Sequence, residues 1–228
     1  MPRCCIDHIT VTAPTLAAGA AFVRDALGVE AQPGGEHPRM GTHNLLLRLG
    51  DALFLEVIAA NPAAPAPGRP RWFALDTLTP QSPPALATWV VRTADIRATQ
   101  AAASEPLGNI EPMSRGALDW LITIPADGAL PLDGAGPALI EWHTDAHPAS
   151  RLPDCGLSLA RLEIIHPQPA RVSRLLQSLQ LDGPLVVTAS PSARLVAYID
   201  TPGGERRLAM PAPCPDNPLL HHRQRDIR

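Results

Sequence analysis

The chain has 228 residues, of which 45% are hydrophobic and 18% charged, and its formal net charge is −3. This length is enough for one large domain or two small ones with a sizeable core. The acidic balance, and the lack of any basic cluster larger than Arg206-Arg207 before the last six residues, argue against a nucleic-acid-binding protein.

Composition also argues against membrane insertion and several cofactor chemistries. No apolar run reaches the roughly 18–20 residues that span a bilayer, and the start of the chain has no hydrophobic signal region, so we expect a cytoplasmic protein. All basic residues are Arg, which leaves no lysine for a Schiff base. The sequence has no Cys-x-x-Cys pair, Walker loop or Rossmann glycine fingerprint, so we expect neither a structural zinc site nor a nucleotide cofactor.

The first 60 residues predict a βαβββ module. Thr15 is a suitable N-cap for its helix, and Gly28 stands where a C-terminal glycine belongs. Strict alternation along the first strand would put Ile6, His8 and Thr10 on one face. The expected elements are a strand over 5–12, a helix over 16–27, a Gly/Pro-rich loop over 32–42, and strands over 43–49 and 52–59 joined by a tight turn.

The βαβββ order of elements repeats, less clearly, in the rest of the chain. A Pro-rich connector over 61–84 leads to a second module over 85–150 and then to a third, partial unit over 151–210. The tail over 211–228 has too little apolar content to pack, so we expect it to be mobile. Strands are expected over 88–92, 118–124, 138–143, 157–165, 184–188 and 194–200, and helices over 95–104 and 168–180.

Four segments carry a family resemblance: Ile6-Asp-His-Ile-Thr-Val, the helix that ends in Leu27-Gly28, Gly34-Gly-Glu-His-Pro-Arg-Met-Gly-Thr-His-Asn44 and Phe54-Leu-Glu-Val-Ile58. They resemble the vicinal-oxygen-chelate superfamily, and more narrowly its glyoxalase-like-domain proteins. The resemblance implies an α+β fold of the glyoxalase/bleomycin-resistance/dioxygenase type, in which repeated βαβββ modules form curled half-barrel sheets around a cavity. It also makes a homodimer plausible, unless the modules here satisfy one another within one chain.

The resemblance further implies a metal site. In the superfamily, ligands come from the first and last strands of each module. Carried over to this chain, these positions are His8 and Glu56 in the first module and Glu141 in the second, with His143 as an alternative on the same strand. The fourth position falls near Trp89, which cannot ligate. One imidazole and two carboxylates suit a divalent Zn, Fe, Mn, Ni or Co ion.

The residues agree with part of this by themselves. Glu56 and Glu141 each interrupt an apolar strand, where an unpaired carboxylate is costly to bury. A metal would act as a Lewis acid while one of these carboxylates, as the catalytic base, moves a proton. The alternative is that His8 is an ordinary hydrogen-bonded core histidine and Glu56 pairs with Arg48 across the hairpin.

The loop over 34–44 supplies candidates for substrate binding. Turn geometry explains its glycines. It does not explain His37, Thr42 and Asn44, which we expect to reach into the cavity as donors to a substrate, with Arg48 as a further candidate.

Two functions of different classes stay open. The first is a glyoxalase-like enzyme that performs metal-assisted lyase or isomerase (or dioxygenase) chemistry on a compound with two adjacent oxygens. The second is a metal-free protein that binds or sequesters a small molecule in the same cavity, and the missing ligand near Trp89 favours it. Either way the expected partner is a small-molecule ligand rather than a nucleic acid or a membrane.

Overall fold

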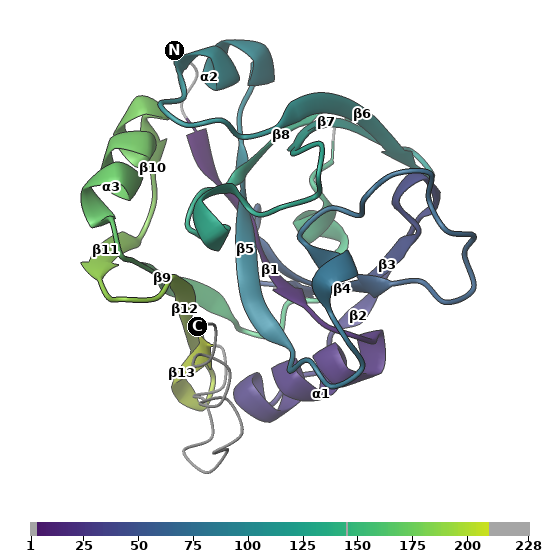
Figure 1. Cartoon of the computed structure of the whole chain (residues 1–228). Coiled ribbons are helices and arrows are strands. Elements are labelled where there is room, and N and C mark those ends of the chain that lie inside the picture. The colour runs from purple at the N-terminus through teal and green to yellow at the C-terminus, as the bar shows by residue number, and fades with distance from the viewer. Residues whose placement is uncertain (1–3, 145, 210–228) are drawn as a thin grey trace, which may run out of the picture.

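Two βαβββ segments build one large mixed sheet (Figure 1). The computed structural model describes residues 4–144 and 146–209, so the tail predicted over 211–228 lies outside the described residues. The first segment consists of β1 (Cys4–Thr12), α1 (Leu16–Leu27), β2 (Gln32–His37), β3 (Thr42–Arg48) and β4 (Phe54–Ala60). The second consists of β5 (Ala85–Arg92), α2 (Ile96–Ala102), β6 (Asn109–Arg115), β7 (Leu118–Ile124) and β8 (Ala138–Trp142).

The order of strands makes the two segments symmetric about the centre of the sheet. It runs β2-β3-β4-β1-β5-β8-β7-β6, with the short β10 (Leu181–Asp182) added beside β1. The first strands of the two segments, β1 and β5, are antiparallel, and each is parallel to the last strand of its own segment. The sheet curls into a half-barrel, which confirms the predicted α+β fold class.

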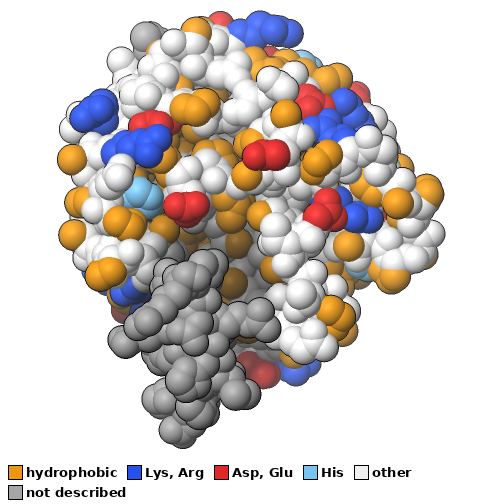
Figure 2. All heavy atoms as spheres, viewed as in Figure 1, with side chains coloured by type: hydrophobic (Ala, Val, Ile, Leu, Met, Phe, Trp, Pro, Cys, Tyr) orange, Lys and Arg blue, Asp and Glu red, His pale blue; other side chains and the backbone are white. Residues whose placement is uncertain are grey.

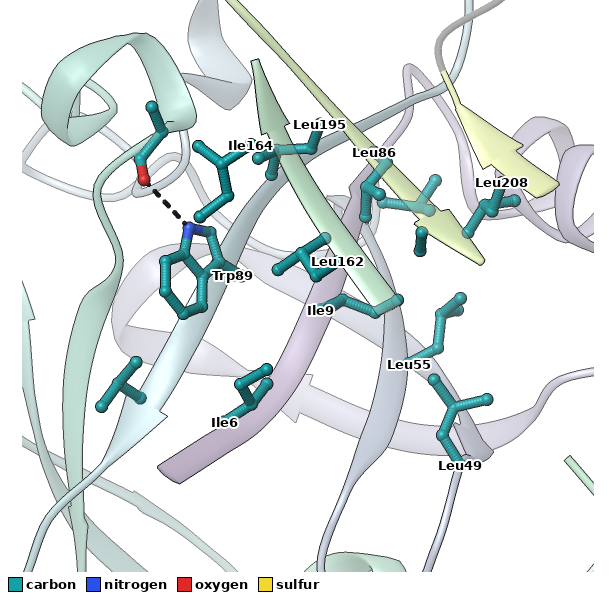
Figure 3. Packing of buried hydrophobic residues seen from close by; sticks show 14 of the residues in the cluster. Ile6, Ile9, Leu49, Leu55, Leu86, Trp89, Leu162, Ile164, Leu195 and Leu208 are labelled. Atoms are coloured by element: carbon teal, nitrogen blue, oxygen red, sulfur yellow. Dashed lines mark hydrogen bonds between the residues drawn. The ribbon is translucent and has the colours of Figure 1, made fainter. Parts of the chain in front are cut away.

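A second sheet covers one face of the half-barrel. It has the order β11-β9-β12-β13 and is accompanied by α3 (Pro169–Ser178). Its strands are β9 (Ser158–His166), β11 (Leu185–Ala189), β12 (Arg194–Thr201) and β13 (Gly204–Ala209). Figure 3 shows Ile9 and Trp89 of the large sheet packed against Leu162 and Ile164 of the small one. Burial of large apolar side chains of this kind contributes roughly 1.5–3 kcal/mol each.

Short 3-10 turns complete the connections: η1 (Pro38–Met40), η2 (Leu75–Thr77), η3 (Pro131–Gly134) and η4 (Pro148–Arg151). Within the described ranges, none of the helices combines the length and apolar character needed to cross a bilayer. On the face shown in Figure 2, Arg and acidic side chains lie interspersed among apolar ones.

The first helix forms as predicted, from Leu16 to Leu27. The Thr15 hydroxyl accepts a hydrogen bond from the backbone N–H of Ala18 at its start. Gly28 ends it with a φ of 75°, in the left-handed region that favours glycine. The first strand departs from strict alternation, because a β-bulge between Ile6 and His8 inserts one extra residue opposite β5.

That bulge separates side chains that alternation would place together. Ile6 packs with Ile9 in the core between the two sheets, whereas His8 faces the inside of the half-barrel. The prediction that Ile6 and His8 share a face was therefore wrong.

The two edge strands of the large sheet were not predicted, and neither was β13 at the edge of the small sheet. β2 replaces part of the expected loop, and β6 falls where no strand was expected. Each contains a proline, Pro33 and Pro112, which an edge strand tolerates because one of its sides has no ladder partner. The curl of the sheet brings these two edges together: Arg115 at the end of β6 reaches His37 at the end of β2.

Candidate active site in the half-barrel

A narrow cavity lies inside the half-barrel, on the face of the sheet that the second sheet does not cover. Its volume of about 30 Å³ is room for about two water molecules. It is lined by His8, His37, Asn44, Leu46, Phe54, Glu56, Trp72, Arg115, Trp120, Ile122, Ile140, Trp142 and Pro148. The polar members of this set come from β1 to β4 and β6, so the curl of the sheet, and not proximity in sequence, assembles them.

Glu56 on β4 is the acidic residue of the cavity. It is 5% exposed, and its Oε1 atom accepts a hydrogen bond of 2.6 Å from the Asn44 amide on β3. The hydroxyl of Thr10 donates to Oε2 at 3.4 Å. The Nε2 atom of His8 lies 3.7 Å from the same Oε2. That separation is too long for a hydrogen bond, and it lets both atoms contact one substrate atom.

His8 is held from behind by Asp7, the bulged residue of β1. Asp7 is fully buried, and its carboxylate accepts hydrogen bonds from His8, His147 and Trp142. Burial alone would raise the pKa of Asp7, but the bonds to His147 and His8 outweigh it and hold that pKa well below its ordinary value. The His8 ring stacks on Phe54 with centroids 4.5 Å apart. Its orientation is therefore fixed.

Arg115 closes the other side of the cavity. Its Nη1 atom lies 3.1 Å from Oδ1 of Asn44 and 3.3 Å from Nε2 of His37. Burial, with Arg115 as the next cause, lowers the pKa of His37 to about 3, so this histidine is neutral near pH 7. Its Nε2 then accepts from Arg115, and its Nδ1–H donates to the Thr42 hydroxyl at 3.2 Å.

The structure brings four of the expected residues to the cavity wall: His8, Glu56, His37 and Asn44. Thr42 does not line the cavity, but its hydroxyl bonds to Nδ1 of His37 and so orients that ring.

Two expected residues lie elsewhere. Glu141 accepts a hydrogen bond of 2.7 Å from the backbone N–H of Ile96 at the start of α2, and it lies 2.8 Å from Nε2 of His143. Arg48 pairs with Asp51 at 2.5 Å and donates to the carbonyl of Leu152. Neither Glu141 nor Arg48 lines the cavity, so we assign neither of them to the candidate site.

The donor set falls short of a resident metal site. Within residues 4–144 and 146–209, no group of three or more His, Cys, Asp and Glu side chains is placed to hold a metal ion. Only His8 and Glu56 converge, and catalytic metals ordinarily take three protein ligands. Trp89 contributes nothing, because it packs between the sheets and its indole N–H donates to the carbonyl of Ala135 (Figure 3).

Two residues that line the cavity were not predicted from the sequence. Arg115 lies on the unpredicted strand β6, and Trp72 lies in the segment 61–84 that was read only as a connector. The pattern around Arg115, Asn-Ile-Glu-Pro-Met-Ser-Arg, gives no alternation that would signal a strand. Only the close match of β2 to the family's glycine-rich string pointed to this edge of the sheet.

An outer groove continues from the cavity and shares His37 and Trp120 with it. Its volume is about 450 Å³, many times that of the inner cavity. The remaining lining residues are Pro38, Arg39, Pro112, Met113, Ser114 and Asp119. The groove therefore leads to a small inner cavity, in which polar side chains face a largely apolar wall.

A half-barrel of two βαβββ segments around a cavity is the architecture of the vicinal-oxygen-chelate superfamily. Within it, the chain belongs to the glyoxalase-like domain family, whose model matches residues 6–180. A comparison with curated proteins found no significant match.

The chain is also similar to solved structures at low sequence identity. The chain is similar to a hypothetical protein from Staphylococcus aureus at 12% identity, with a TM-score of 0.60 over 83% of this chain and 87% of that one. It also matches methylmalonyl-CoA epimerases from Streptomyces coelicolor and Mycobacterium tuberculosis at 19% and 14% identity, with TM-scores of 0.40 and 0.38. Those two matches cover 62% and 60% of this chain and 97% and 85% of the epimerases.

Proposed function

We propose that this glyoxalase-like protein is a small-molecule enzyme in which Glu56 and His8 move a proton on a substrate with neighbouring oxygens. The observation that carries the proposal is the buried Glu56 carboxylate, whose Oε2 atom lies 3.7 Å from the Nε2 atom of His8 across the cavity. A buried carboxylate beside an imidazole supplies the general base that isomerase or lyase chemistry next to a carbonyl requires.

The surrounding bonds assign a role to each atom. Asn44 holds Oε1 of Glu56 and leaves Oε2 to act as the base. Asp7 accepts the Nδ1 proton of His8, and this tautomer of the ring leaves Nε2, which faces the cavity, as a proton acceptor. In the proposed step, a C–H bond next to a carbonyl breaks. The proton passes to Glu56, and the bonding electrons move to the carbonyl oxygen as an enolate. Return of the proton from Glu56 to the neighbouring carbon, while Nε2 of His8 carries the hydroxyl proton from one oxygen to the other, completes an isomerisation.

The outer groove suits the part of the substrate that does not react. Its volume of about 450 Å³ accommodates a substituent well beyond the two or so heavy atoms that the inner cavity admits. We place the reacting carbon at the mouth of the cavity, between Glu56 and the shared residues His37 and Trp120.

Solvent exchange tests the proton transfer without knowledge of the natural substrate. Pyruvate, pyruvamide and hydroxyacetone each carry exchangeable C–H bonds beside a carbonyl. In D2O, proton NMR should show faster loss of at least one of these signals with the protein than without it. Glu56→Gln should lower that rate at least a hundredfold, in line with the contribution of a general base. No exchange with any of the three, or an undiminished rate in Glu56→Gln, would refute the proposal.

The metal-assisted version expected from the sequence has its own test. Superfamily members commonly use divalent metals, but the donor set here supplies two converging ligands. Elemental analysis of freshly purified protein, before and after exposure to Zn, Fe, Mn, Ni and Co ions, should find less than about a tenth of an equivalent. Exchange rates should also be indifferent to chelator. A full equivalent of metal that His8→Ala removes would restore the metal-assisted reading.

The second candidate function is a metal-free binding protein. It is favoured because two polar side chains of the cavity already have hydrogen-bond partners: Asn44 donates to Glu56, and His37 bonds to the Thr42 hydroxyl. A binding protein would show ligand-induced thermal stabilisation that Glu56→Gln leaves in place, together with no exchange in D2O.

A further inference from the structure

We propose that the cavity has a carboxylate subsite, formed by the guanidinium of Arg115 and the indole N–H of Trp72, and that the substrate is therefore a short oxo- or hydroxy-carboxylate. This inference deepens the proposed function and rests on it for the reaction, though not for the binding.

Arg115 forms no ion pair among the described residues, although the charge of Glu56 in the same cavity acts on its guanidinium from farther away. Its recorded hydrogen bonds go to two neutral acceptors, Oδ1 of Asn44 and Nε2 of His37. Within the described ranges, no carboxylate lies within ion-pair distance of its guanidinium. Both of these hydrogen bonds are made by Nη1. The N–H groups of Nη2 and Nε have no hydrogen bond to the described residues and can therefore donate to a ligand. A half-buried guanidinium with unused donors is suited to a planar carboxylate.

Trp72 supplies a second unused donor. The side chain is 3% exposed and lines the cavity, and its indole Nε1 has no hydrogen-bond partner within the described chain. Leaving a buried N–H unpaired costs free energy, so a ligand that accepts from it gains that amount on binding. Trp72 and Arg115 both contact His37, Trp72 through ring packing at 5.1 Å between centroids and Arg115 through Nη1.

Size and charge select a carboxylate among the possible anions. The inner cavity of about 30 Å³ admits roughly two oxygen-sized atoms, which matches the two oxygens of a carboxylate. A phosphate brings four oxygens and up to two negative charges into a space that also holds the Glu56 carboxylate. His37 is neutral near pH 7 and does not add a second cation to balance them.

The binding experiment compares pyruvate with pyruvamide, which has the same shape without the charge. Titrations followed by calorimetry should show pyruvate binding at least tenfold more tightly than pyruvamide. Arg115→Gln should weaken pyruvate binding at least tenfold, as expected for loss of a charge-assisted hydrogen bond. Trp72→Phe keeps the ring and removes the N–H, and it should weaken binding about threefold to tenfold. The matched controls Arg97→Gln on the exposed face of α2 and Trp89→Phe between the sheets should leave the affinity unchanged.

The outcomes separate this inference from the proposed function. Pyruvate binding that depends on Arg115 and persists in Glu56→Gln supports the subsite even if no variant exchanges protons. Proton exchange that is unaffected by Arg115→Gln would keep the proposed function and overturn the subsite. Equal affinity for pyruvate and pyruvamide, preferential binding of inorganic phosphate, or no detectable pyruvate binding would each overturn it. Because Arg115 also bridges two strand edges, a melting curve on each variant confirms folding, and Trp72→Phe tests the same subsite without touching that bridge.

Discussion

The Oδ1 atom of Asp7 lies 2.7 Å from Nδ1 of His8, although consecutive side chains of a regular strand point to opposite faces. The bulge in β1 makes this contact geometrically accessible, because it inserts one residue opposite β5 between Ile6 and His8. The same bulge therefore turns His8 into the cavity and places a carboxylate behind it. Asp7 is a positioning residue, since it contacts His8, His147 and Trp142 and forms an ion pair with Arg92 at 3.8 Å, and none of these atoms belongs to a substrate.

Asp7→Asn should reduce proton exchange at least a hundredfold while it changes pyruvate affinity by less than threefold. An asparagine amide can donate to Nδ1 of His8, which reverses the tautomer and puts the proton on Nε2. Nitrogen chemical shifts of the His8 ring report the tautomer directly, and a merely structural role would not move them. Trp142→Phe removes one other bond to Asp7 and keeps the carboxylate, so it should retain most of the activity. An unchanged tautomer together with an unchanged rate would rule out this role.

Acid should destabilise the protein through His37. Its folded-state pKa of about 3 is lower than the ordinary 6.5, so the unfolded chain binds more protons between these values. The free energy of unfolding should therefore fall as pH drops from about 6.5 toward 3, by up to about 1.4 kcal/mol per pH unit. Asp7, whose folded pKa is also lowered, adds to the loss only below its ordinary value of 3.8, because its contribution is present above that pH.

Urea titrations between pH 4.5 and 7 check this dependence. The slope of unfolding free energy against pH should flatten in His37→Gln. His143→Gln, at an exposed histidine outside the cavity, should keep the slope of the unmodified protein. A steep slope that survives in His37→Gln would assign the effect to other groups.

The sequence was informative where one residue type broke an otherwise clear pattern. Glu56 interrupts an apolar strand, and the family's strings at β1 and β2 pointed to His8, His37 and Asn44; all four line the cavity. The faces of a strand are harder to assign when both are buried. On β8, Ile140 and Trp142 face the cavity, so Glu141 points away from it. Both faces of this strand carry large apolar residues, and alternation alone therefore does not predict which face lines the cavity.

The residues that were missed lie where tertiary structure overrides local preference. β6 forms because it pairs with β7 and because the curl of the sheet brings it against β2. Both causes lie outside the strand, so its own seven residues do not predict it. Arg115 could therefore be recognised only once the two sheet edges were seen to meet. Trp72 likewise gains its role from the fold, since it lies in a segment without regular strands or α-helices.

Gly34→Ala should disturb the site without any backbone strain. A Cβ at this position would overlap Oδ1 of Asn44 and press on Leu46, so Asn44 would have to move. Because Asn44 binds both Glu56 and Arg115, we expect exchange rate and pyruvate affinity to fall together, each at least fivefold. Gly68→Ala is the control, since a Cβ there meets no atom within 4 Å. Equal kinetics in the two variants would show that Asn44 does not organise the cavity.

Glu141→Gln should affect α2 rather than the active site. The carboxylate accepts a hydrogen bond from the N–H of Ile96 in the first turn of that helix, where negative charge is favourable by roughly 0.3–1 kcal/mol. We expect thermal unfolding to show a loss of that size, and pyruvate affinity and exchange rate to stay within twofold of the unmodified protein. The paired variant Glu56→Gln provides the contrast, because it should abolish exchange. If Glu141→Gln instead cost tenfold or more in either functional measurement, this carboxylate would have to reach the cavity in solution, and the two-ligand argument against a resident metal would fail with it.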